Sequence, residues 1–155
     1  MTAHVPLRLC VRGTGNGKSG APDGILLRIP SEFSYIEHAI DVVARHCLAF
    51  GISANAARFK VRVALCEALS NAIVYGNGMD PGKQVHVKVH VRGSHVQVSV
   101  EDEGEGFDPQ DVPDPTHDTN LENPRGRGLF LIRQLVDDLT FNDRGNSICM
   151  TWHRA

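Results

Sequence analysis

Two runs of alternating valines, joined by a short polar turn, constrain the fold of this chain more than any other feature. The first run is Val85, Val87, Val89 and Val91, and the second is Val96, Val98 and Val100. Strict alternation of apolar and polar residues is typical of a β-strand with one buried face and one solvated face. The "RGSH" between the runs lets the second strand turn back beside the first. The sequence therefore predicts an antiparallel hairpin.

Asp102 continues the alternation of the second run, which places a carboxylate on the inward face where the strand ends. Burying a carboxylate is costly unless it accepts hydrogen bonds. A ligand with an exocyclic amino group, such as adenine, would supply the donor, and Gly104 and Gly106 would permit a close approach of the backbone to it. The stretch is equally compatible with a solvated strand end and an Asp-Gly turn.

Two amphipathic helices are expected before the hairpin, one from an N-cap at Ser31 to Gly51 and one over about residues 55–75. A third helix is expected to begin near Gly128. Short strands are expected at residues 25–29 and in "LTFN" and "SICMTWH" near the end of the chain. This order predicts an α+β fold, a two-layer sandwich of a mostly antiparallel sheet with helices on one face.

Glu67 and Asn71 lie four residues apart on the second expected helix, so they share one helical face beside its apolar stripe. A carboxylate and an amide oxygen at a cleft would suit Mg²⁺ or the orientation of a hydroxyl group. The same pair would also be ordinary on an exposed helix edge.

Gly126 and Gly128 flank Arg127 just before the third apolar stripe. Free N–H groups, the positive end of a helix dipole and a guanidinium would together attract an anion. A flexible junction between a loop and a helix would have a similar composition.

The bulk composition excludes several classes of protein. A net charge of −2 and a pI near 6.4 give no reason to expect nucleic acid or an anionic membrane as the main partner. No apolar run is long enough to span a membrane and no signal peptide is apparent, so we expect a cytoplasmic protein. Its four scattered cysteines indicate neither a zinc site nor a disulfide framework.

The glycine-rich stretch "VRGTGNGKSG" resembles a phosphate-binding P-loop, but its spacing is wrong. Arg12 stands where the first glycine of that motif is required, and turn-forming residues follow Lys18 instead of a helix. A Gly/Ser-rich loop is therefore the expected structure, and Lys18 is not expected to bind phosphate.

The motifs around Glu67, Asp102 and Gly128 occur in the same order as in a known fold. They resemble the N box, G1 box and G2 box of the GHKL ATP-binding fold, which histidine kinases share with Hsp90-type chaperones and MutL. The phrases "EALSNAIVYG", "DEGEGFDP" and "GRGLFLI" resemble more closely the anti-sigma-factor serine kinases of the RsbW/SpoIIAB type. The resemblance implies a Bergerat-type ATP-binding domain over residues 25–155, with residues 1–24 as an N-terminal extension or extra strand.

The resemblance implies a role for each matching residue. Glu67 is the general base that readies a serine hydroxyl or a water, and Asn71 completes the Mg²⁺ site at the ATP phosphates. Asp102 accepts from the adenine amino group, and Gly104 and Gly106 shape the pocket wall.

The G2 segment implies the phosphate contacts. Its residues here are Gly126, Arg127, Gly128 and Leu129, whose backbone N–H groups meet the phosphates, with residues 107–125 as a lid. The implied partners are a sigma factor and a STAS-type anti-anti-sigma protein that is phosphorylated on serine, and a homodimer is the implied assembly.

The chain departs from the family pattern in two motifs. Tyr75 stands where the family often has histidine, and Asn146 and Ser147 stand where it has threonine. These departures leave open a nucleotide-dependent binding module with little or no kinase activity. A detached histidine-kinase ATPase domain is a further alternative, although no phospho-acceptor helical hairpin precedes the motifs.

Overall fold

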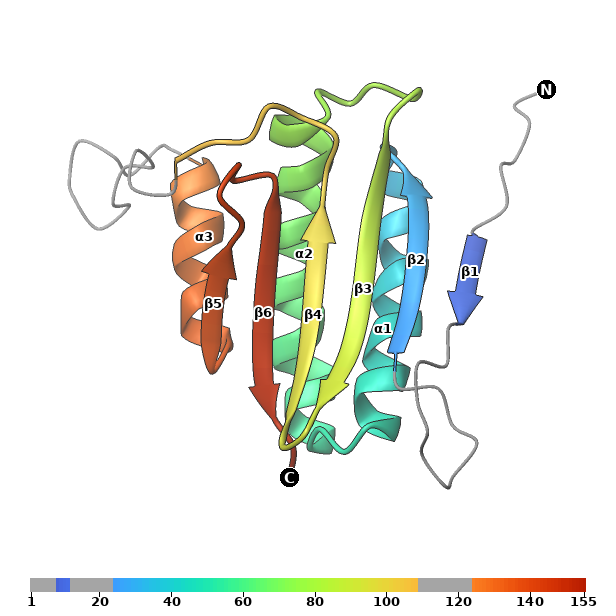
Figure 1. Ribbon diagram of the computed structural model, residues 1–155, viewed down its shortest axis with the longest axis vertical. Helices are drawn as coiled ribbons and strands as arrows, with labels where there is room; N and C mark the ends of the chain where they lie inside the picture. The colour runs from blue at the N-terminus through green and yellow to red at the C-terminus, as the bar shows by residue number, and fades with distance from the viewer. Residues whose placement is uncertain (1–7, 12–23, 109–123) are drawn as a thin grey trace.

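The computed structural model describes residues 8–11, 24–108 and 124–155, which form one antiparallel sheet with helices on one face (Figure 1). The strands are β1 (Arg8–Val11), β2 (Gly24–Pro30), β3 (Gln84–Arg92), β4 (His95–Glu101), β5 (Asp138–Phe141) and β6 (Ser147–His153). Their order across the sheet is β1-β2-β3-β4-β6-β5, and every neighbouring pair is antiparallel. The predicted α+β two-layer sandwich is confirmed.

The predicted hairpin is formed by β3 and β4. Val87 pairs with Val100 and Val89 pairs with Val98, so the alternating valines of the two strands lie side by side on one face. These valines are buried and form the centre of the core under the helices. Their burial anchors the hairpin, because each aliphatic side chain removed from water contributes about 1.5–3 kcal/mol.

Three long helices cover the valine side of the sheet, behind the strands in Figure 1. A short 3-10 turn, η1 (Phe33–Tyr35), leads into α1 (Ile36–Ala49). The second predicted helix is α2 (Val61–Asn71), extended at its ends by two π-helical turns, η2 (Ala56–Lys60) and η3 (Ala72–Gly76). The third helix is α3 (Pro124–Leu135), and α2 lies between α1 and α3 (Figure 1).

Two predicted helix starts were wrong. Ser31 does not cap α1, which has no side-chain cap, because its hydroxyl instead donates to the Lys83 carbonyl at 2.7 Å. The third helix begins at Pro124 rather than near Gly128. Proline is favoured in the first turn of a helix because its missing N–H would have no intrahelical partner there. Gly126 and Gly128 therefore lie inside α3.

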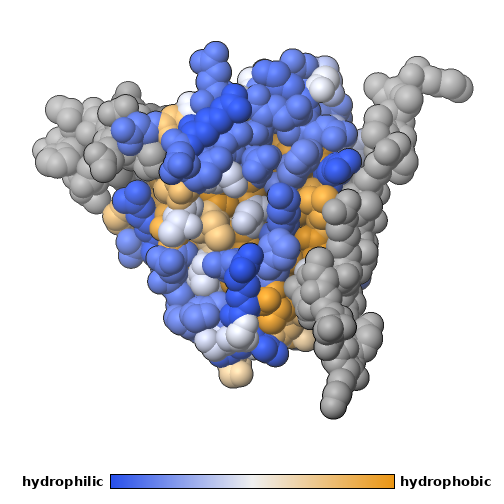
Figure 2. Space-filling model, viewed as in Figure 1, coloured by the Kyte–Doolittle hydropathy of each residue, from blue (hydrophilic) through white to orange (hydrophobic). Residues whose placement is uncertain are grey.

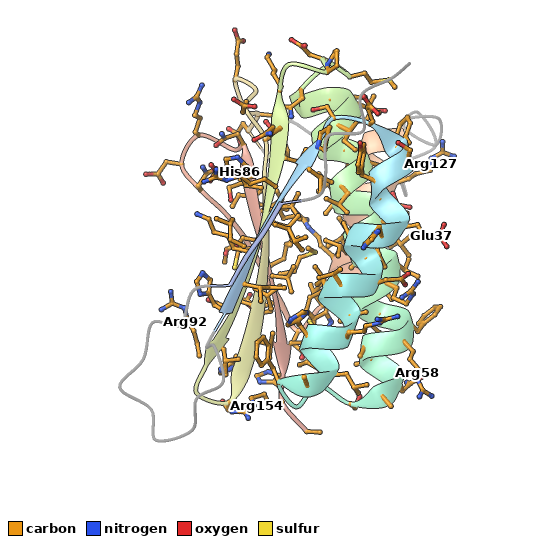
Figure 3. The ribbon with its side chains drawn as sticks, turned by 90° about the vertical axis from the view of Figure 1, so that its right-hand side faces the viewer. Glu37, Arg58, His86, Arg92, Arg127 and Arg154 are labelled. Atoms are coloured by element: carbon orange, nitrogen blue, oxygen red, sulfur yellow. The ribbon has the colours of Figure 1, made fainter. Side chains whose placement is uncertain are left out.

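The opposite face of the sheet has no helix over it in the described part of the chain. Figure 2 shows this face, where hydrophilic side chains predominate and apolar residues are visible in the central band. His86 of β3 and Arg92 at its end point away from the helices (Figure 3). Within the described ranges, no helix combines the length and apolar character that a membrane span requires. The P-loop-like stretch around Lys18 lies outside the described residues, as do residues 109–123 of the predicted lid.

Candidate functional site

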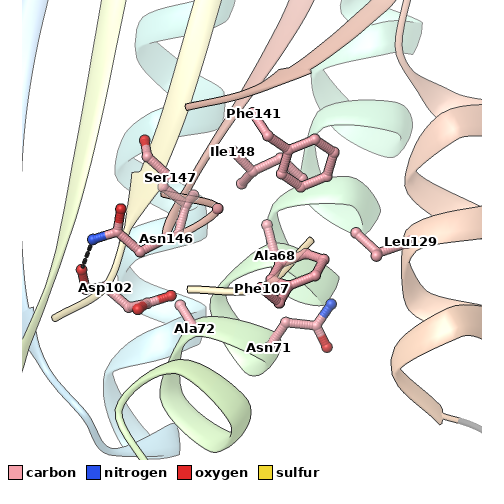
Figure 4. Close-up of a pocket in the computed structure, with 12 residues that line it drawn as sticks. Ala68, Asn71, Ala72, Asp102, Phe107, Leu129, Phe141, Asn146, Ser147 and Ile148 are labelled. Carbon is pink, nitrogen blue, oxygen red and sulfur yellow. Dashed lines mark hydrogen bonds between the residues drawn. The ribbon is translucent and has the colours of Figure 1, made fainter. Parts of the chain in front are cut away.

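A hollow opens between α2, the end of β4 and α3 (Figure 4). Most of its wall is apolar, formed by Ala68, Ala72, Val100, Phe107, Leu129, Phe141 and Ile148. Its polar atoms come from Asn71, Asp102, Asn146 and Ser147, with Gly145 between the last strands. The predicted residues Asn71, Asp102 and Leu129 are thus brought together in one cavity.

Asp102 follows directly after β4 and is half-buried, and its backbone is bonded to Asn146, the residue before β6. The Asp102 N–H donates to the Asn146 carbonyl at 2.9 Å. The Asn146 side-chain amide donates to the Asp102 carbonyl at 2.9 Å, as Figure 4 shows. The Gly104 N–H donates to Asp102 Oδ1 at 2.8 Å. The carboxylate is therefore held in one orientation at the edge of the hollow, where it can accept a hydrogen bond from a ligand.

Gly76 forms the wall behind Asp102. A Cβ atom on Gly76 would lie 2.2 Å from Asp102 Cγ, and one on Gly104 would lie 2.2 Å from the Gly76 carbonyl oxygen. Any side chain at either position would collide with the carboxylate or its support. Gly76 was not among the predicted site residues, and the signal that could have found it is the glycine that ends the "NAIVYG" helix segment.

Glu67 and Asn71 lie on the side of α2 that faces the start of α3. A Cβ atom on Gly128 would lie 2.9 Å from Glu67 Oε2 and 3.4 Å from Asn71 Nδ2. The structure therefore places the N-box and G2-box residues in direct contact. A side chain at position 128 would crowd the end of the Glu67 side chain, which would have to shift.

The remaining predicted residues are more scattered. Gly106 has a φ of 83°, and a Cβ atom there would lie 1.7 Å from the Arg144 carbonyl oxygen, so it shapes the loop after β4. Gly126 is buried within α3. The Arg127 side chain is exposed on the helical side of the molecule (Figure 3) and does not line the hollow.

Two phenylalanines contribute to the cavity: Phe107, the first residue of the predicted lid, and Phe141, which was not predicted. The Phe107 and Phe141 rings pack edge to face, with centroids 5.6 Å apart and an interplanar angle of 81°. Such an arrangement is favourable between aromatic rings. It gives the hollow an aromatic boundary, which suits a flat ligand. Phe107 directly follows the predicted Gly106, whereas Phe141 reaches the site only through the pairing of β5 with β6.

An apolar cavity with a carboxylate at one edge fits a flat heteroaromatic ring that carries an amino group. Glu67 and Asn71 of α2 lie beside the first turns of α3. The N-terminus of a helix favours negative charge. The residues present therefore fit a nucleotide whose base carries an amino group. Among the described residues, no cluster of three or more His, Cys, Asp or Glu side chains could hold a metal ion by itself.

The fold and this cavity define a nucleotide-binding domain of the ATPase class. The sequence matches the histidine kinase-like ATPase domain over residues 29–152, and the chain belongs to this family. The predicted resemblance is confirmed at the level of particular relatives as well.

Two relatives named serine-protein kinase RsbW cover most of the chain. The one from Oceanobacillus iheyensis is 25% identical over 128 residues, which are 79% of this chain and 80% of that protein. The one from Listeria innocua is 27% identical over 139 residues, which are 83% and 86%. An anti-sigma F factor from Anoxybacillus flavithermus is 26% identical over 89 residues, which are 56% and 61%.

Proposed function

We propose that this protein is an ATP-dependent serine-protein kinase that also acts as an anti-sigma factor. The contact of Gly128 with Glu67 and Asn71 carries the proposal, together with Asp102 at the edge of the same hollow. Asn71 links the two groups, because it lines the hollow with Asp102 and lies beside Gly128 together with Glu67, the candidate general base. The names of the relatives support the same class of activity.

In the proposed complex the adenine ring occupies the apolar hollow and its amino group donates to Asp102. The Gly104 N–H bonds to the Asp102 carboxylate and the Asn146 amide bonds to the Asp102 backbone, so the carboxylate would not have to be reoriented on binding. Gly126, Arg127, Gly128 and Leu129 at the start of α3 would bind the phosphates.

Asn71 would complete the site of a Mg²⁺ ion that neutralises charge on the ATP phosphates. Mg²⁺ commonly takes few protein ligands and keeps water and phosphate oxygens in its coordination shell. Glu67 would accept the proton of a serine hydroxyl group. The serine oxygen would bond to the γ-phosphorus as the bond between that phosphorus and ADP breaks.

The proposed partners are a sigma factor, which the protein sequesters, and a STAS-type anti-anti-sigma protein, which it phosphorylates on serine. We propose that it works as a cytoplasmic homodimer and that residues 107–125 serve as the lid. Phosphorylation would then prevent the antagonist from capturing the kinase.

Transfer of label from γ-³²P-ATP to a STAS-domain protein of the same organism tests the kinase assignment. The wild type should label a serine, whereas Glu67→Gln should bind ATP with unchanged affinity and fail to label. Glu67→Gln preserves the shape of the side chain, so its loss of labelling would report the missing base. Equal labelling by the variant would contradict the role of Glu67.

A second candidate is a nucleotide-dependent binding module without useful transferase activity. It is favoured by Asn146, which lines the hollow and binds the Asp102 backbone where the family pattern has threonine. ATP binding without labelling, combined with nucleotide-dependent capture of a sigma factor, would support this candidate over the kinase.

A further inference from the structure

Asn77 is a buried polar residue just outside the hollow, and nothing in the proposed chemistry uses it. Its side chain is 2% exposed. Its amide nitrogen donates to Ser31 Oγ at 2.9 Å and to the Gln84 carbonyl at 3.0 Å. Its amide oxygen accepts from the Glu103 N–H at 2.7 Å. All hydrogen-bonding groups of this amide are thus directed at three separate segments of the chain.

The bond to Glu103 connects Asn77 to the base-binding carboxylate. Glu103 lies between Asp102 and Gly104, whose N–H orients Asp102 Oδ1. The Glu103 carboxylate in turn accepts from the Gln84 N–H, so the residue is held at both its backbone and its side chain.

The backbone around Asn77 packs against the same segment. The Asn77 N–H donates to the Ala72 carbonyl at 2.8 Å, which closes the π-helical turn η3. This turn places Gly76 directly against Asp102 and Gly104. π-helical turns are rare and occur frequently at functional sites. Here the turn presses Gly76 and Asn77 onto the peptide that carries Asp102.

We propose that Asn77 is a positioning residue that sets recognition of the nucleobase amino group by fixing the Asp102–Gly104 segment. This inference rests on the proposed binding of ATP in the hollow. Asn77 does not line that hollow, so it would act through Asp102 and not by contact with the nucleotide. Its loss should therefore weaken recognition of the amino group without affecting the contacts to the phosphates.

Ser31 offers a matched control on the far side of the same network. It is 1% exposed, accepts from Asn77 and donates to the Lys83 carbonyl. Ser31→Ala would therefore remove two buried hydrogen bonds of the network while leaving the bond between Asn77 and Glu103 in place. Both Ser31→Ala and Asn77→Ala should lower the thermal stability, but only the second should release Glu103.

The experiment compares the affinities for ATP and for purine ribonucleoside triphosphate, which lacks the 6-amino group, by calorimetry with Mg²⁺. The wild type should prefer ATP by about ten-fold or more, the value of a hydrogen bond to a charged group. Asp102→Asn and Asn77→Ala should reduce this preference toward unity, whereas Ser31→Ala should retain it. Asn77→Ala should bind the analogue as tightly as the wild type does.

A measurement on the wild-type protein covers the case in which Asn77→Ala does not fold. Hydrogen exchange of the Glu103 amide should be slowed several-fold more by ATP than by the analogue, because the amino group and Asn77 would secure the same segment. Equal slowing by the two nucleotides would overturn the inference.

The outcomes separate this inference from the proposed function. If the wild type binds neither nucleotide, the proposed function fails and the inference with it. If Asp102→Asn loses the preference for ATP while Asn77→Ala keeps it, only the role of Asn77 is overturned. An equal loss of affinity for both nucleotides in Asn77→Ala would assign that residue a purely structural role, which also contradicts the inference.

Discussion

A methyl group on Gly128 would lie 2.9 Å from Glu67 Oε2, so the backbone of α3 packs directly against the carboxylate of α2. This separation is shorter than ordinary van der Waals contact, and the Glu67 side chain would have to shift. Two helices that are far apart in the sequence thereby depend on one glycine for their spacing at the site.

Gly128→Ala should move the Glu67 carboxylate and lower phosphoryl transfer, while the fold survives. Alanine is favoured over glycine inside a helix by about 0.5–1 kcal/mol, so the crowding is offset in part and the free energy of unfolding should change little. Urea denaturation and the labelling assay on the same preparation measure the two effects. A variant with full transferase activity would show that the Glu67 position is not restricted.

Glu67→Ala supplies the control for this crowding. Without the Glu67 carboxylate, the new methyl group would lie 3.4 Å from Asn71 Nδ2, which is an ordinary van der Waals contact. Gly128→Ala should then raise the free energy of unfolding by about 0.5–1 kcal/mol in the Glu67→Ala background. A double-mutant cycle with equal effects in both backgrounds would contradict the contact.

Asp102→Asn should abolish preferential binding of ATP, whereas Lys18→Ala should leave the affinity unchanged. Asparagine keeps the size of the side chain but replaces one acceptor oxygen with a donor group, which would face the amino group of adenine. Lys18 belongs to a glycine-rich stretch whose spacing does not fit a P-loop. Calorimetric titration with ATP and Mg²⁺ checks both variants, and the reverse pattern would refute the location of the site.

The hairpin and the inward position of Asp102 could be predicted because they depend on local periodicity. The valines alternate without interruption, so the face and the pairing of β3 and β4 follow from their order. The helix stripes were equally clear, since each recurs at intervals of three and four residues. These features also determine the layer architecture.

Features that depend on contacts between distant segments could not be predicted in the same way. Ser31 has the composition of an N-cap, but its hydroxyl bonds to Lys83 and Asn77 instead. Asn77 lies in "GNGMDPG", which has the composition of a solvated loop, although it is buried by segments up to 46 residues away. Gly126 and Gly128 interrupt the apolar pattern of α3, so the start of this helix was predicted near Gly128, later than its actual start at Pro124.

Trp152→Phe should reduce the free energy of unfolding by about 1 kcal/mol or more. Trp152 is buried in β6, and its Nε1 donates to the Leu135 carbonyl at the end of α3 at 2.8 Å. Phenylalanine keeps an aromatic ring but leaves that carbonyl without its donor and the core with less volume. Urea denaturation gives the stability. ATP affinity should remain close to that of the wild type, because Trp152 does not line the hollow.

The stability of the protein should fall in alkaline solution through Cys47. Burial in the core raises the pKa of the Cys47 thiol from its ordinary value of 9.0 to about 12. Between these two values the unfolded chain loses the thiol proton while the folded protein retains it, so deprotonation stabilises the unfolded state and the free energy of unfolding falls as the pH rises.

Cys47→Ala removes this titration while leaving every other ionisable group in place. Going from about pH 8 to about pH 10, the wild type should lose about 1 kcal/mol more stability than the variant, since one pKa unit corresponds to about 1.4 kcal/mol. Urea denaturation under reducing conditions at both pH values measures the difference. Parallel pH dependence of the two proteins would show that the Cys47 thiol ionises as readily in the folded protein as in the unfolded chain.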